Sequence, residues 1–140
     1  MDNNTNTNNT ETADITAEFL ARIQGYIQIK LYAHDADKDP NHGMWIFGNR
    51  LIEDALSAQD DIVKGVDYIA NKSEQLQRAV LEGRNTGYYI QCIQSKVNDM
   101  NTAQNNFESN VRNLRGLIYH CVSPATADDL WDMSTLPEAI

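Results

Sequence analysis

Apolar residues recur at alternating steps of three and four along two long stretches of this sequence, and this pattern limits the fold more than any other feature. The first stretch covers residues 52–80 and the second covers residues 90–121. A 3-4 spacing that is kept for about four heptads is typical of the a and d positions of a coiled coil. Residues 83–87 lie between the two stretches and contain two glycines, which suit a tight turn. The pattern therefore predicts an all-α fold built on a long antiparallel coiled-coil helical hairpin.

The expected contact between the two helices can be written position by position. In an antiparallel register Val80 faces Ile90, and Ile69 faces Met100. The predicted seam of the first helix consists of Ile52, Ala55, Gln59, Ile62, Val66, Ile69, Ser73, Leu76 and Val80. The predicted seam of the second helix consists of Ile90, Ile93, Val97, Met100, Gln104, Phe107, Val111, Leu114, Ile118 and Cys121. Polar residues within such a seam usually fix the register or the number of partners.

The remaining segments are expected to pack around this hairpin. A length of 140 residues suits one domain. We predict a helical bundle over residues 12–122, with helices at 14–33, 44–82 and 86–122. The shortest helix begins at an Asp14 N-cap and packs on the open end of the hairpin, as far as Gly65 and Asn101. Residues 1–11 are rich in Asn and Thr and predict a disordered polar leader.

The last segment, residues 123–140, predicts an acidic tail with a short helix. Thr126 is the expected N-cap of that helix. The Leu130–Trp131 pair would be unfavourable if it were left exposed. We therefore expect Trp131 to pack against Trp45 at the open end of the hairpin.

The distribution of charge excludes several kinds of partner. The formal net charge is −9, and it divides into −4 over residues 1–43, −1 over residues 44–122 and −4 over residues 123–140. No Lys/Arg cluster could neutralise several phosphates, so we expect no nucleic-acid partner. No apolar run approaches the roughly 20 residues that cross a bilayer, so we expect no membrane span. The expected location is cytoplasmic, and leaderless export is the alternative.

Several residues with metal-binding side chains fall near the open end of the hairpin. They are His34, His42, His120 and Cys121, together with Asp35, Asp37 and Asp39. These are ligand types that zinc uses, but the paired short spacings of structural zinc sites are missing. We therefore expect no metal, no cofactor and no catalytic residue, and a small metal-dependent enzyme is the less favoured hypothesis.

The sequence favours a non-enzymatic helical interaction or assembly protein that acts through coiled-coil surfaces. Beyond Gly65 and Asn101 the predicted hairpin has only two helices, so part of its apolar stripes stays exposed to solvent. We expect this exposed apolar surface to bind another copy of the chain or a partner helix. The expected partner-binding residues are Val66, Ile69, Leu76, Val80, Tyr89, Ile90, Ile93, Val97, Met100 and Trp131. The alternative hypothesis is a helical substrate, chaperone or filament component of a bacterial secretion apparatus, to which the layout of polar leader, hairpin and acidic tail is similar.

Overall fold

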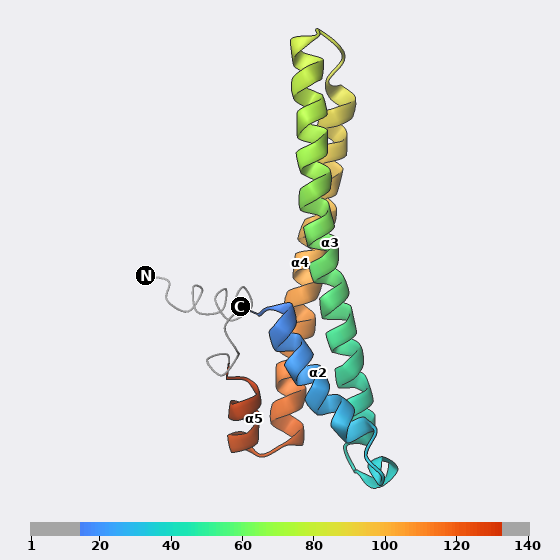
Figure 1. Cartoon of the computed structure of the whole chain (residues 1–140), viewed down its shortest axis with the longest axis vertical. Coiled ribbons are helices and arrows are strands. Elements are labelled where there is room, and N and C mark those ends of the chain that lie inside the picture. Colours follow the sequence, from blue (N-terminus) through green and yellow to red (C-terminus); the bar gives the residue numbers. More distant parts are fainter. Residues whose placement is uncertain (1–14, 133–140) are drawn as a thin grey trace, which may run out of the picture. The chain divides into compact units, whose positions relative to one another are not determined.

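The structure is a computed structural model that describes residues 15–132 (Figure 1). These residues form four α-helices and no strand, so the predicted all-α class is confirmed for the described part of the chain. The elements are α2 (Ala17–Leu31), the short 3-10 helix η1 (Ala36–Lys38), α3 (His42–Leu81), α4 (Gly87–Cys121) and α5 (Pro124–Leu130). The predicted leader over residues 1–11, the export hypothesis that depends on it, and residues 133–140 of the tail lie outside the described residues.

The chain divides into two compact units, and α3 and α4 each contribute to both. One unit is Met1–Leu56 together with Glu108–Ile140, and the other is Ser57–Phe107. The unit that contains α2 therefore takes α3 only as far as Leu56 and α4 only from Glu108. The 15 residues of α2 span about 22 Å, and the predicted reach of this helix to Gly65 and Asn101 stays a prediction.

The unit that contains α2 has a dense apolar core. Thr16 is the N-cap of α2, in place of the predicted Asp14, and its hydroxyl accepts a hydrogen bond from the backbone N–H of Phe19. The fully buried large side chains are Phe19, Leu20, Ile23 and Ile27 of α2, Trp45 and Ile52 of α3, and Leu114 and Ile118 of α4. A Cβ atom at Gly48 would lie 3.1 Å from Ile27 Cδ1 and 3.3 Å from Leu117 Cδ2. The absence of a side chain at Gly48 thus lets three helices meet closely.

The helix α5 packs on α2. Ser123 is its N-cap and Pro124 occupies its first turn, whereas we had predicted Thr126 as the cap. The Arg22 side chain donates hydrogen bonds of 2.8 Å from Nη2 to the carbonyl oxygens of Leu130 and Asp132. The Trp131 ring lies edge-on to Phe19, with 5.0 Å between the ring centroids. The tail helix is docked, but Trp131 contacts Phe19 rather than the predicted Trp45.

Trp45 instead belongs to the connection between α2 and α3. Its ring lies edge-on to Tyr26 at 6.0 Å, and its Nε1 donates a hydrogen bond to Asp39 Oδ2 at 3.0 Å. Asp39 Oδ1 also accepts a 2.8 Å hydrogen bond from the backbone N–H of Asn41. This carboxylate therefore fixes the loop before α3 and orients the first buried side chain of that helix.

The Ser57–Phe107 unit consists of the second part of α3 and the first part of α4. Their buried and half-buried residues recur at steps of three and four. On α3 they include Ala58, Ile62, Gly65, Ile69, Lys72, Leu76 and Ala79. On α4 they include Thr86, which precedes the helix, and then Tyr89, Ile93, Lys96, Met100, Ala103 and Phe107. This set is named the seam below.

The seam differs from the predicted one at every second position of this unit. Gly65 and Ala79 occupy places that we had assigned to Val66 and Val80, which are 55% and 62% exposed. The residue in close contact with Met100 is Gly65, four residues before the expected Ile69. The observed and the predicted series both repeat every seven residues, and they differ by a constant shift of one residue at alternate positions. On α3, three of the four shifted positions are occupied by small residues: Ala58, Gly65 and Ala79.

Candidate functional site

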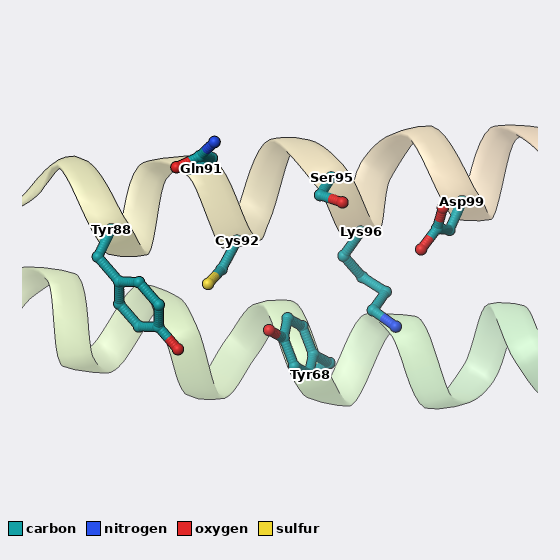
Figure 2. Close-up of a pocket in the computed structure, with 7 residues that line it drawn as sticks. All are labelled: Tyr68, Tyr88, Gln91, Cys92, Ser95, Lys96 and Asp99. Carbon is teal, nitrogen blue, oxygen red and sulfur yellow. The ribbon is translucent and has the colours of Figure 1, made fainter.

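One face of the Ser57–Phe107 unit carries an open groove of about 460 Å³. It is lined by Tyr68 of α3 and by Tyr88, Gln91, Cys92, Ser95, Lys96 and Asp99 of α4. Figure 2 shows the side chains of Tyr88, Cys92 and Lys96 pointing from α4 towards α3, which contributes Tyr68 to the groove. A second depression of about 390 Å³ shares Lys96 and Asp99 with this groove.

Two lysines of the seam place their ammonium groups on aromatic rings of the groove. Lys96 Nζ lies 4.7 Å from the centroid of the Tyr68 ring, and Lys72 Nζ lies 5.6 Å from the same centroid. Lys72 Nζ is also 5.5 Å from the centroid of Tyr88. Contacts of this kind contribute about 0.5–1 kcal/mol at exposed sites. The lysine stems thus pack in the seam, while their charged ends emerge on the groove side.

Cys92 connects the two tyrosines of the groove. The pKa values of the Tyr68 and Tyr88 phenols are raised above the ordinary value of 10.0, first of all by hydrogen bonding with the neighbouring Cys92 thiol. The sequence between residues 57 and 107 contains no histidine that could act as a base for Cys92.

The other face of the same unit contains no charged side chain, and it is named the uncharged face below. Its members are exposed: Val63, Val66, Ala70, Ser73, Gln77 and Val80 on α3, and Ile90, Gln94, Val97 and Asn101 on α4. Ile90 and Val97 are 42% and 40% exposed, so large apolar side chains on both helices face solvent here. The uncharged face is the main apolar surface of this unit.

The predicted partner-binding residues separate into three groups. Val66, Val80, Ile90 and Val97 lie on the uncharged face, where a partner could reach them. The half-buried residues of the seam are Ile69, Leu76, Tyr89, Ile93 and Met100. Trp131 belongs to the other unit and is half-buried against Phe19. Binding of a partner by any of them stays a prediction.

The candidate metal ligands are not brought together. Within residues 15–132 no group of three His, Cys, Asp or Glu side chains is arranged to hold a metal ion. His34 and His120 are exposed, and His34 Nε2 lies 4.0 Å from Asp35 Oδ1. His42 is half-buried and Asp37 is exposed on η1, while Asp39 is engaged by Asn41 and Trp45. Burial first, and the charge of Asp39 second, raise the pKa of the Cys121 thiol.

The groove that contains Tyr68, Cys92 and Lys96 was not predicted from the sequence. The signal was present as a second 3-4 series, because Lys72 lies three residues after Ile69 and four before Leu76. The sequence of α3 therefore contains two 3-4 series, which differ by a shift of one residue at alternate positions. The predicted series on α3 contains the valines Val66 and Val80, whereas the observed seam contains the smaller Gly65 and Ala79 at the neighbouring positions.

Comparison with known proteins gave no match: no family model, no curated protein and no solved structure is similar to this chain. In the part of the chain that the structure describes, no helix has the length and apolar character needed to cross a membrane.

Proposed function

We propose that this chain is a non-enzymatic helical interaction protein that self-associates through its Ser57–Phe107 unit. In this proposal α3 and α4 of the unit form an antiparallel coiled-coil hairpin, and the hairpin supplies the surface for assembly. The observation that carries the proposal is the poor core of this unit. Its fully enclosed residues are small, with the exception of Phe107: they are Ala58, Gly65, Ala79 and Ala103.

The contrast with the other unit supports this proposal. All eight of the largest fully buried side chains belong to the unit that contains α2. In the Ser57–Phe107 unit the large apolar residues of the seam, such as Ile69, Leu76 and Ile93, are only half-buried. Each apolar Å² removed from water contributes about 25 cal/mol, so the cover of these side chains by further helices would favour association.

The proposal is tested by the mass of the full-length chain in solution. Light scattering coupled to size exclusion, over a range of protein concentrations, should show a defined oligomer of the 15.8 kDa chain. Leu76→Asp places a charge in the seam and should reduce the mass to that of a monomer. Ile29→Asp is the matched control, because Ile29 is an exposed residue of the other unit, and it should leave the mass unchanged. A monomer at every concentration would overturn the proposal.

A further inference from the structure

We propose that the uncharged face binds the same face of a second copy of this chain, which gives a two-fold symmetric bundle of four helices. The inference rests on the proposed function and names both the surface and its occupant. Four observations carry it: the position of this face relative to the groove, the separation of charge around the helices, the half-buried residues beneath the face, and its self-complementary chemistry.

The uncharged face and the groove lie on opposite sides of the seam. Val66 precedes Tyr68 by two residues, and Ile90 precedes Cys92 by two residues, which is about 200° around an α-helix. Tyr68 and Cys92 line the groove, so Val66 and Ile90 lie on the far side of the seam on their respective helices. The exposed residues of α3 and α4 on that side therefore form one continuous face.

Charge is separated around the two helices. The charged residues of α3 in this unit are Asp60, Asp61, Lys64, Asp67, Lys72, Glu74 and Arg78, and those of α4 are Lys96 and Asp99. None of them is a member of the uncharged face, and Asp67 and Glu74, which follow Val63 and Ala70 by four residues, lie along its edge. Lys64 pairs with Asp60 at 2.8 Å, which keeps these charges together on the outer surface. Depletion of charge is the feature that distinguishes the centre of a protein interface from ordinary surface.

The large half-buried residues of the seam adjoin this face rather than the groove. Ile69 lies beside Val66 and Ala70, and Ile93 lies beside Ile90 and Val97, by their spacing of one, three and four residues. The lysines of the seam, by contrast, lie on the groove side, where Lys72 and Lys96 reach Tyr68. A second copy on the uncharged face would therefore cover the side chains that the two helices leave partly open.

The chemistry of the face suits its own copy. Gln77, Gln94 and Asn101 each carry a donor and an acceptor, so across a two-fold axis these side chains can hydrogen-bond to the polar residues of the identical face. A partner chosen by charge would find no charge on this face to recognise. The whole unit holds six acidic and five basic residues, so two copies carry little mutual repulsion.

The size of the face indicates how tight the contact is. Residues 63–80 span about 26 Å of helix, and two helices are about 20 Å wide, which gives about 500 Å² per copy. Two copies would bury about 1,000 Å² in total, which is the lower limit for a specific interface. We therefore expect a reversible dimer that dissociates on dilution, with each groove left open to solvent.

The experiment compares two double variants of the full chain that add equal charge. Val66→Glu with Val97→Glu places two carboxylates on the uncharged face. Asn71→Glu with Asn98→Glu places them at exposed positions of the same two helices that lie off this face. Sedimentation equilibrium over a concentration series should give a mass that rises from 15.8 kDa towards twice that value for the natural chain and for the second variant. The first variant should stay at 15.8 kDa with unchanged helix content by circular dichroism.

The outcomes separate this inference from the proposed function. A natural chain that stays monomeric contradicts both. If the Val66→Glu, Val97→Glu variant still forms an oligomer, the assigned face is wrong, but the proposed self-association is not contradicted. An oligomer larger than a dimer contradicts the two-fold arrangement. If the charged variant loses helix content, Val66→Thr with Val97→Thr keeps the side-chain shape and should raise the dissociation constant about tenfold. An unchanged dissociation constant would overturn the inference.

Discussion

Met100 lies so close to Gly65 that a Cβ atom at position 65 would be 2.6 Å from both Met100 Cγ and Met100 Sδ. Gly65 is buried in the middle of α3, which continues without interruption from His42 to Leu81. The glycine neither breaks nor ends the helix. Its role is to make room for the Met100 side chain of α4 at this level of the seam.

Gly65→Ala should therefore destabilise the protein although alanine favours helix. Alanine gains up to about 1 kcal/mol over glycine in a helix, while an added methyl in a packed contact costs about 1–3 kcal/mol, so we expect a net loss of about 1 kcal/mol. With Met100→Ala the obstructing atoms are gone, and the same substitution should become stabilising. Gly116→Ala is the control, because a Cβ there meets no atom within 4 Å. Urea denaturation of the four members of the cycle measures the effect, and equal changes in both backgrounds would contradict the assigned contact.

Trp131→Ala should destabilise the unit that contains α2, because it removes the ring that covers the fully buried Phe19. Truncation of a fully buried Trp costs about 3–5 kcal/mol, and Trp131 is half-buried, so we expect about 2 kcal/mol. Trp131→Phe keeps an aromatic edge and should cost less. Chemical denaturation followed by circular dichroism measures both variants, and an unchanged midpoint for Trp131→Ala would show that α5 contributes nothing to this unit.

Part of the fold follows from local sequence patterns. The 3-4 spacing correctly predicted all-α structure and the existence of each long helix, with ends within one or two residues: α3 begins at His42 instead of residue 44, and α4 ends at Cys121 instead of residue 122. These features depend on periodicity and on turn residues, which act over a few positions. Long-range contacts do not, and the contact of Trp131 with Phe19 instead of Trp45 is decided by how α5 packs on α2.

The candidate surfaces were only half predictable for the same reason. Val66 and Ile90 were expected to contact each other's helices and also a partner, and the structure leaves them on an exposed face. The position of the seam depends on how closely the two helices can pack. Because Gly65 accommodates the Met100 side chain, the seam follows the series that contains the small residues. Residue spacing alone cannot distinguish neighbouring phases. The groove with Cys92 could therefore be recognised only after the helices were packed.

The stability of the α2–α3 connection should fall in acid through Asp39. The pKa of this carboxyl lies below its ordinary value of 3.8, first because the backbone N–H of Asn41 donates a hydrogen bond to it, and also because Trp45 Nε1 does. A lowered pKa in the folded state means that the contribution is present above about pH 3.8 and is lost as the pH falls through the folded value. Asp39→Asn should remove this component, so its melting temperature should change less between pH 5 and pH 2 than that of the natural chain. Parallel curves for the two proteins would contradict the assignment.

The last prediction concerns the contact between Lys96 and Tyr68 in the groove. Lys96 Nζ lies 4.7 Å from the centroid of the Tyr68 ring, and the lysine is half-buried in the seam. An ammonium over an aromatic face is attracted by the negative charge density of the ring, so the two residues should be coupled by about 0.5–1 kcal/mol. Lys96→Met keeps the length of the side chain and removes the charge, and Tyr68→Leu removes the ring. Denaturation of the two single variants and the double variant gives the coupling free energy.

Two further variants assign that coupling to the ring. Tyr68→Phe keeps the aromatic face and removes only the hydroxyl, so its coupling to Lys96 should be close to that of the natural tyrosine. Arg78→Met, ten residues away from Tyr68 on α3, should show no coupling to Tyr68→Leu. If the Tyr68→Phe variant loses the coupling, the hydroxyl and not the ring holds the ammonium. If no coupling is measured at all, Lys96 stabilises the seam only through its aliphatic stem, which packs between α3 and α4 while solvent surrounds its charge.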